Sequence, residues 1–216
     1  MLAGSTTKTF VFETEIVSSP DDFRSLRQSE EHGRKLYNAV LGKLLSSLSR
    51  MKQSREYKVT VFLPKTDPRR KADFAQLRLD YGLSEFAAIS LASKSRTGSV
   101  DFAVYVPSKV AQEIGKRAFH AVERKMFGKA KRCRFKRKGS DFSLKGSSNK
   151  ESPQIKITGE TACMIFRKKE YPLNIDQQNP YHRHALEQRI KSSQILKRTI
   201  GGRERWFVQL CLEGEA

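Results

Sequence analysis

The sequence predicts a fold of the α+β class, because helix patterns and strand patterns occupy separate stretches of the chain. Residues 8–17 alternate apolar and polar side chains, as in a half-buried strand. Residues 19–128 carry apolar side chains mainly at helical spacing, and short β-like segments follow from residue 154 to the end. We therefore expect a strand, then a helical half, then a β half, within a length of 216 residues that suits one large domain or two small ones.

The first strand, KTFVFETEIV, places three apolar side chains on one face: Phe10, Phe12 and Ile16. Ser19 is a good N-cap and Pro20 suits the first helical position, so a helix is predicted to begin there. Apolar residues at helical spacing continue for about 30 residues, most clearly from Tyr37 to Leu48.

The middle of the chain predicts a mixture of short elements. Residues 57–64, YKVTVFLP, are rich in β-branched side chains and predict a strand. One helix is expected from Asp67-Pro68 to about Gly82, and a second after Ser84. Residues 100–106 are expected to be extended, and a long helix is expected from Pro107-Ser108 to about Gly128.

The β half is punctuated by Gly, Ser and Asn. Three short strands are predicted, at 154–158, 161–167 and 171–175, with a turn or short helix near 182–190. Gly201-Gly202 predicts the turn of a final hairpin. On its second strand, the single tryptophan, Trp206, is interpreted as a core residue rather than a platform on which a base stacks.

The net charge points to an anionic partner. The formal charge is +19 and the pI is about 10. The thirty residues from Lys116 to Lys145 hold twelve Lys or Arg against two acidic residues, with Phe135 and Phe142 among them. A solvated basic face is the alternative, but cations for phosphates beside rings for bases are typical of a nucleic-acid surface.

Candidate phosphate contacts follow from this segment. The strongest are Lys129, Lys131, Arg132, Arg134, Lys136, Arg137 and Lys138, and Arg117, Arg124 and Lys125 extend the basic track along the preceding helix. Phe135 is predicted either to stack on a base or to anchor the segment to the β half. Such a surface predicts an affinity that falls steeply with salt.

Other classes of site receive little support. The three cysteines are far apart and the pair His182 and His184 lacks neighbouring ligands, so no metal site and no cofactor are expected. No apolar run approaches a membrane span, and the N-terminus does not resemble a signal peptide, which predicts a cytoplasmic protein that does not bind membranes. No catalytic constellation, Walker loop or acidic strand suited to two-metal chemistry is visible.

Three motifs in order resemble a known family: RKLYNAVL (34–41), the long helix running into GKAKRCRFKRKGSDFSL (107–144), and RERWFVQLCLEG (203–214). Together they are similar to the N-terminal half of TnpB-like (OrfB) proteins, the transposon-encoded relatives of type V CRISPR effector nucleases. Cys133 departs from that family's pattern, and residues 55–106 match none of its motifs. The resemblance implies that Arg34 and Asn38, the Arg and Asn of the first-helix motif, contribute to nucleic-acid binding.

The resemblance also implies an architecture. Residues 1–18 and 129–216 would build a wedge domain, an oligonucleotide-binding-like β-barrel, and residues 19–128 an inserted helical recognition lobe. In the family these parts grip a guide RNA and help to read the target DNA, whereas a RuvC-like domain and a zinc ribbon cleave. Because the chain ends at Ala216, before the first RuvC motif, we expect binding of RNA and DNA without enzymatic activity.

Three hypotheses remain open from the sequence. The first is a nucleic-acid-binding module that lacks the nuclease domain, as a truncated protein, a fragment, or a chain completed by a separate RuvC-type chain. The second is a piece of an intact RNA-guided nuclease or transposase. The third is an unrelated basic ribosomal or nucleoid protein, which would explain the charge but not the ordered halves.

Overall fold

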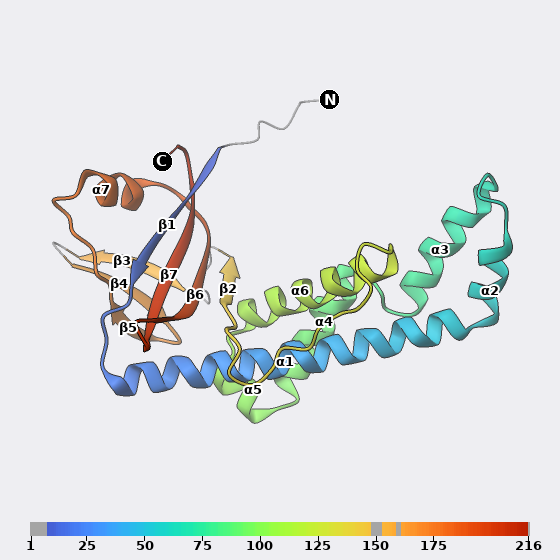
Figure 1. Cartoon of the computed structure of the whole chain (residues 1–216), viewed down its shortest axis with the longest axis horizontal. Helices are drawn as coiled ribbons and strands as arrows, with labels where there is room; N and C mark the ends of the chain where they lie inside the picture. Colours follow the sequence, from blue (N-terminus) through green and yellow to red (C-terminus); the bar gives the residue numbers. More distant parts are fainter. Residues whose placement is uncertain (1–7, 148–152, 159–160, 216) are drawn as a thin grey trace. The chain divides into compact units, whose positions relative to one another are not determined.

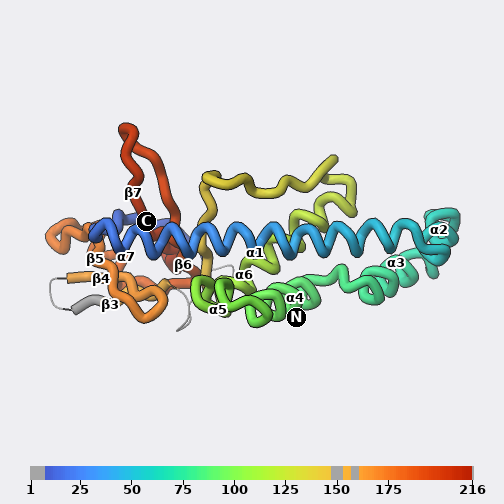
Figure 2. The backbone as a smooth tube through the Cα atoms, turned by 90° about the horizontal axis from the view of Figure 1, so that it is seen from below, coloured from blue at the N-terminus to red at the C-terminus, as the bar shows by residue number. Residues whose placement is uncertain are grey.

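The computed structural model describes residues 8–147, 153–158 and 161–215, and it places the chain in the α+β class (Figure 1). The chain divides into two compact units. Unit 1 comprises Met1–His32, Tyr105–Val110 and Gly139–Ala216, and unit 2 comprises Gly33–Val104 and Ala111–Lys138. The long helix α1 (Pro20–Gln53) begins in unit 1 and ends in unit 2, and Figure 2 shows it as one continuous helix.

Unit 1 contains two antiparallel sheets. The four-stranded sheet has the order β1-β7-β6-β2, formed by Thr9–Glu15, Arg203–Glu213, Ile190–Ile200 and Leu144–Ser147. The three-stranded sheet has the order β3-β4-β5, formed by Gln154–Thr158, Thr161–Phe166 and Lys169–Pro172. Within the described ranges both sheets are open and joined by the isolated bridge between Ile16 and Leu173, so the predicted closed barrel is not confirmed.

Apolar alternation along neighbouring strands of the four-stranded sheet contributes to the core of unit 1. Phe12 of β1 pairs with Leu210 of β7, and both side chains are buried. Trp206 is 1% exposed, and its indole N–H donates to Glu204 (2.9 Å), so its predicted core position is confirmed. Phe142 is also buried, which removes it from the predicted nucleic-acid surface.

Local sequence signals set the other elements of unit 1. The predicted hairpin turn is confirmed, because Gly201 and Gly202 both have positive φ angles (57° and 74°) between β6 and β7. Helix α7 (Pro180–Glu187) is N-capped by Asn179, whose side chain accepts from the Tyr181 N–H (2.9 Å).

Unit 2 is helical. After α1 it contains α2 (Arg55–Phe62), α3 (Pro68–Asp80), α4 (Glu85–Thr97), α5 (Val100–Tyr105, of which Tyr105 belongs to unit 1) and most of α6 (Ser108–Met126). The side chains of Ser54, Asp67 and Ser84 cap α2, α3 and α4. The core lies between α1, α4 and α6, and its buried residues are Leu36, Val40, Leu44, Ala88, Ala92, Ile114, Ala118 and Val122.

Two predicted strands are wrong. Residues 57–64 lie in α2 up to Phe62, because Ser54 caps that helix and the ring of Tyr57 packs edge-on against Phe74 of α3 (5.7 Å between centroids). Residues 100–105 form α5, in which the Arg96 guanidinium donates to the Ala103 carbonyl (3.2 Å). In both segments tertiary contacts override a β propensity that depends on context.

No helix in the described ranges is both long enough and apolar enough to cross a bilayer.

Candidate nucleic-acid interface

The positive charge of the chain belongs almost entirely to unit 2. That unit carries 25 Lys or Arg against 8 Asp or Glu, a formal charge of +17, which leaves +2 for unit 1. Because the two units are of similar length, this division reflects both an excess of cations in unit 2 and an excess of acidic residues in unit 1. Unit 2 is therefore the part of the chain that attracts polyanions.

Unit 1 neutralises most of its charges internally. Arg198 donates to Glu13 from Nη1 and Nη2, and Arg205 donates to Glu15 from Nε and Nη2. Lys197 lies 2.9 Å from the Glu30 carboxylate, and both of these side chains are largely buried. Cations held in this way are less available to phosphates.

We call the segment Lys129–Lys138 the basic strap. It contains no helix or strand, and its two end residues lie in a bend and a turn. It follows α6 through Gly128, whose positive φ angle of 71° ends the helix. The Ala130 N–H then donates back to the Arg124 carbonyl (3.0 Å). In Figure 1 the strap is the irregular yellow-green stretch after α6.

The strap is held to the helices by its backbone. Lys136 exchanges two hydrogen bonds with the Asn38 side chain: its N–H donates to Oδ1 (2.9 Å) and its carbonyl accepts from Nδ2 (2.8 Å). The same carbonyl accepts from Nη1 of Arg34 (2.8 Å). Arg34 and Asn38, predicted from the resemblance as nucleic-acid contacts, are thus one helical turn apart on α1 and position the strap.

A second anchor lies three residues earlier. The Cys133 thiol donates to the Ala121 carbonyl of α6 (3.1 Å), and burial raises its pKa, an effect that nearby Lys125 partly offsets. The sequence alone did not predict an anchor at Cys133. The local signal was a neutral thiol placed directly between Arg132 and Arg134.

Around these anchors most of the strap's cationic side chains face solvent. The exposed ones are Lys129, Lys131, Arg132, Arg134, Arg137 and Lys138, and Lys136 is half-buried. Among the residues that the structure describes, no ion pair engages the side chains of Lys129, Lys131, Arg132, Arg134 or Lys138. Fixed backbone with unneutralised cations is an arrangement that can bind successive phosphates of a strand.

Phe135 anchors the strap to a helix and not to the predicted β half. An atom at the Cβ position of Gly42 on α1 would lie 3.8 Å from the Phe135 ring, so the ring rests against this glycine. The side chain is nevertheless 53% exposed. It therefore contacts α1 of unit 2, rather than the β half, and presents part of its ring for stacking.

The candidates on α6 differ in exposure. Arg124 is exposed and Lys125 half-buried, both in the last turn. Arg117 lies deeper in unit 2, and its burial lowers the pKa of its guanidinium. Nearby Tyr37 is also buried, which raises the pKa of its hydroxyl. The structure thus brings Arg34, Asn38 and the strap together, while Arg117 lies within the packed part of unit 2.

Neither histidine of the HxH motif belongs to a ligand cluster. The N–H of Asp176 donates to Nδ1 of His182 (3.0 Å). Within residues 8–147, 153–158 and 161–215, no three His, Cys, Asp or Glu side chains gather in a way that could hold a metal ion.

Comparisons with known proteins give a distant similarity to solved structures. No family model and no curated protein matches the sequence. Among solved structures, the chain is similar to a chain of the cryo-EM structure of the Cas12f1–sgRNA–target DNA complex, with 10% identity and a TM-score of 0.39. The similarity covers 96% of this chain and 58% of that chain, so this chain spans less than two thirds of it. These values assign neither a fold family nor an activity.

Proposed function

We propose that the chain binds RNA through the basic strap of unit 2. One observation carries the proposal: the strap's backbone is anchored by Asn38, Arg34 and Cys133, while most of its cations face solvent and five of them form no ion pair with any residue that the structure describes. A basic surface that only keeps the protein soluble does not need such anchors, because flexible side chains on any helix would give the same solubility.

The chemistry of binding is electrostatic. Each phosphate neutralised by a Lys or Arg releases condensed counterions, which is the main source of affinity in such complexes. Anchoring of the strap lowers the entropic cost of ordering it on binding. The half-exposed ring of Phe135 adds a face on which a base can stack, with no need for a particular sequence.

The finer assignment extends this function to a TnpB-like module. In this assignment, unit 2 acts as the recognition lobe and the sheets of unit 1 act as the oligonucleotide-binding-like wedge. Together they hold a guide RNA scaffold and assist contact with target DNA in the prokaryotic cytosol. Two of the motifs behind the resemblance, around Arg34–Asn38 and around Lys136, contact each other, which supports this reading. The module binds and does not cleave by itself, so cleavage would need a further RuvC-type domain or chain.

A matched pair of charge variants tests RNA binding. Anisotropy of a fluorescein-labelled RNA containing a hairpin and a single-stranded tail is measured at 150 mM salt. We expect the triple variant K131E/R132E/R134E to lose affinity by more than about tenfold. The control K168E/R183E/R203E changes the net charge equally at exposed positions outside the strap and should lose clearly less affinity, because the proposal places the main phosphate contacts on the strap.

Two results contradict the proposal. One is an equal loss in both triple variants, which would mean that only net charge matters. The other is hydrolysis of RNA or DNA by the purified chain with Mg²⁺, which would contradict binding without cleavage.

A further inference from the structure

A second site candidate lies beside the start of the strap. The end of α1, the helices α2 and α3, and the end of α6 enclose a cavity of about 620 Å³ in unit 2. This volume lies within the usual range of ligand pockets, about 300–1,000 Å³. Its lining combines three aromatic rings with five Lys or Arg side chains and one carboxylate.

The rings and cations of this cavity are paired. Arg70 lies over the Phe74 ring (5.7 Å to the centroid), and Arg78 lies over the Phe127 ring (5.6 Å). The Tyr57 ring packs edge-on against the Phe74 ring and not face to face. Ring faces of this pair therefore remain for other contacts. Phe127 is 55% exposed, so its ring is not committed to the core.

Two polar groups indicate the charge of the ligand. Within the described residues the Nε of Arg70 is buried and has no hydrogen-bond partner, which is costly for a charged donor. The single carboxylate, Asp67, is engaged by Arg69 (2.9 Å) and caps α3, and these hydrogen bonds lower its pKa. The cavity therefore offers cationic donors without a competing free acid.

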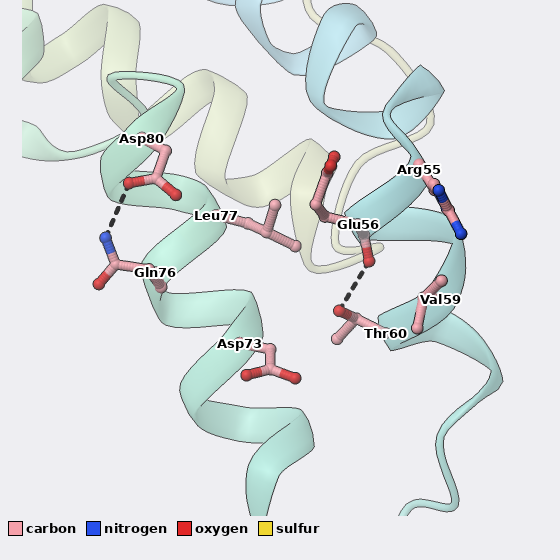
Figure 3. Close-up of a pocket in the computed structure, with 8 residues that line it drawn as sticks. All are labelled: Arg55, Glu56, Val59, Thr60, Asp73, Gln76, Leu77 and Asp80. Atoms are coloured by element: carbon pink, nitrogen blue, oxygen red, sulfur yellow. Dashed lines mark hydrogen bonds between the residues drawn. The ribbon is translucent and has the colours of Figure 1, made fainter.

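The neighbouring pocket on α2 and α3 has the opposite character. It measures about 530 Å³, and Figure 3 shows the carboxylates of Asp73 and Asp80 on its α3 wall, with the Gln76 amide donating to Asp80 (2.7 Å). Glu56 adds a third acid to the lining of this pocket, and Arg55 is the one cation in that lining. The same two helices thus separate an acidic pocket from a basic one, so the high charge of unit 2 does not by itself explain the basic one.

We propose that the basic aromatic cavity accepts one unstacked base, with its phosphate, from the strand that the strap binds. The inference rests on the proposed function. Phe127 lies two residues before the first strap cation, Lys129, so a strand that leaves the strap reaches this cavity next. The base stacks on the exposed Phe127 ring or on Phe74, and the phosphate binds Arg70 and Arg78.

Photocrosslinking tests where the base lies. The full chain is irradiated with a single-stranded RNA in which every uridine is 4-thiouridine, and crosslinked peptides are mapped by mass spectrometry. We expect crosslinks at Phe127, Phe74 or Tyr57 in addition to the strap. Excess uridine monophosphate should not remove them, because the cavity takes its base from a strand that the strap holds. Crosslinks confined to the strap would overturn this inference.

Variants of the rings give an independent measure. F127L and F74L each remove a stacking face but no charge, so we expect affinity to fall by roughly tenfold with an unchanged salt dependence. F62L is the control, because Phe62 is 87% exposed on α2 and lies outside the cavity. If F74L does not fold, R78Q serves as the second variant of the cavity. R78Q removes one cation, so it should weaken RNA binding and lower the salt dependence of the affinity.

The outcomes separate this inference from the proposed function. If strap variants abolish binding while F127L and R78Q bind as the wild type does and crosslinks map to the strap alone, the cavity is not a base site and the proposed function stands. If the wild type binds no RNA, both are overturned.

Discussion

At the scale of single residues, one asparagine connects segments 98 positions apart in sequence. Asn38 presents its amide to the backbone of Lys136 as an adjacent strand would, with one donated and one accepted hydrogen bond. The spacing of Arg34 and Asn38 on one helix face was predictable, but their partner was not, because local periodicity carries no information on a contact of such sequence separation.

This contact yields a prediction for N38A. The substitution leaves the Lys136 N–H without its acceptor, so we expect a loss of about 1–2 kcal/mol in the free energy of unfolding. RNA affinity should also fall, because a released strap must be ordered on binding. The slope of affinity against salt should not change, since no cation is removed.

The control for N38A is S46A, at an exposed position of the same helix. It should raise the free energy of unfolding by no more than about 0.5 kcal/mol, because alanine has the higher helix propensity, and leave RNA affinity unchanged. Urea denaturation measures the first and anisotropy titrations in several salt concentrations measure the second. A reduced salt slope in N38A would show that Asn38 does more than position the strap.

At the scale of elements, the helices with clear caps and apolar stripes were predictable, including α1, α3, α4 and α6. The two wrong predictions, at 57–64 and 100–106, involve short segments whose conformation is set by neighbours such as Phe74 and Arg96. Register between strands and the approach of α4 to α6 also depend on packing that a local pattern does not encode.

Two glycines in helices predict opposite effects of the same substitution. At Gly115 in α6, an added Cβ would lie 2.7 Å from the Ala88 carbonyl of α4, so G115A should destabilise the chain by about 1–3 kcal/mol. At Gly42 in α1, the nearest atom is 3.8 Å away on Phe135, so G42A should stabilise it by about 0.5–1 kcal/mol. Thermal unfolding of both variants checks this, and equal effects would contradict the close packing of α4 and α6.

The first turn of α1 predicts a pH dependence. Ser19 and Asp22 form reciprocal backbone–side-chain hydrogen bonds (both 3.2 Å), and Asp22 also pairs with Lys169, which together with Ser18 holds the pKa of Asp22 well below its usual value. Because the folded pKa is lowered, this stabilisation is fully present above the ordinary Asp pKa of about 3.9 and is lost as pH falls below it.

The variant D22N should therefore be less stable than the wild type by about 1 kcal/mol at pH 7. The difference should shrink as pH is lowered below about 4, because Asp22 is protonated there in the unfolded wild type and folding must release that proton. Denaturant titrations at pH 7, 5, 4 and 3 measure it. A difference that stays constant down to pH 3 would place the stabilising contact elsewhere.

At the scale of the whole molecule, charge is divided between the units far more unevenly than the total suggests. The sequence shows +19 and a basic segment, but unit 1 is assembled from three separate stretches of chain and its ion pairs join distant residues such as Glu13 and Arg198. Only the folded chain shows that unit 1 neutralises its cations and that unit 2 keeps a charge of +17 with an anchored, exposed strap.

The most direct test of this account is the salt dependence of RNA binding by the wild type and by K131Q/R132Q/R134Q. For a single strand, log affinity falls against log salt with a slope of about 0.7 per phosphate contact. The account predicts that the variant's slope is smaller than that of the wild type by about 2. An unchanged slope would show that these cations do not contact phosphates and would contradict the central claim.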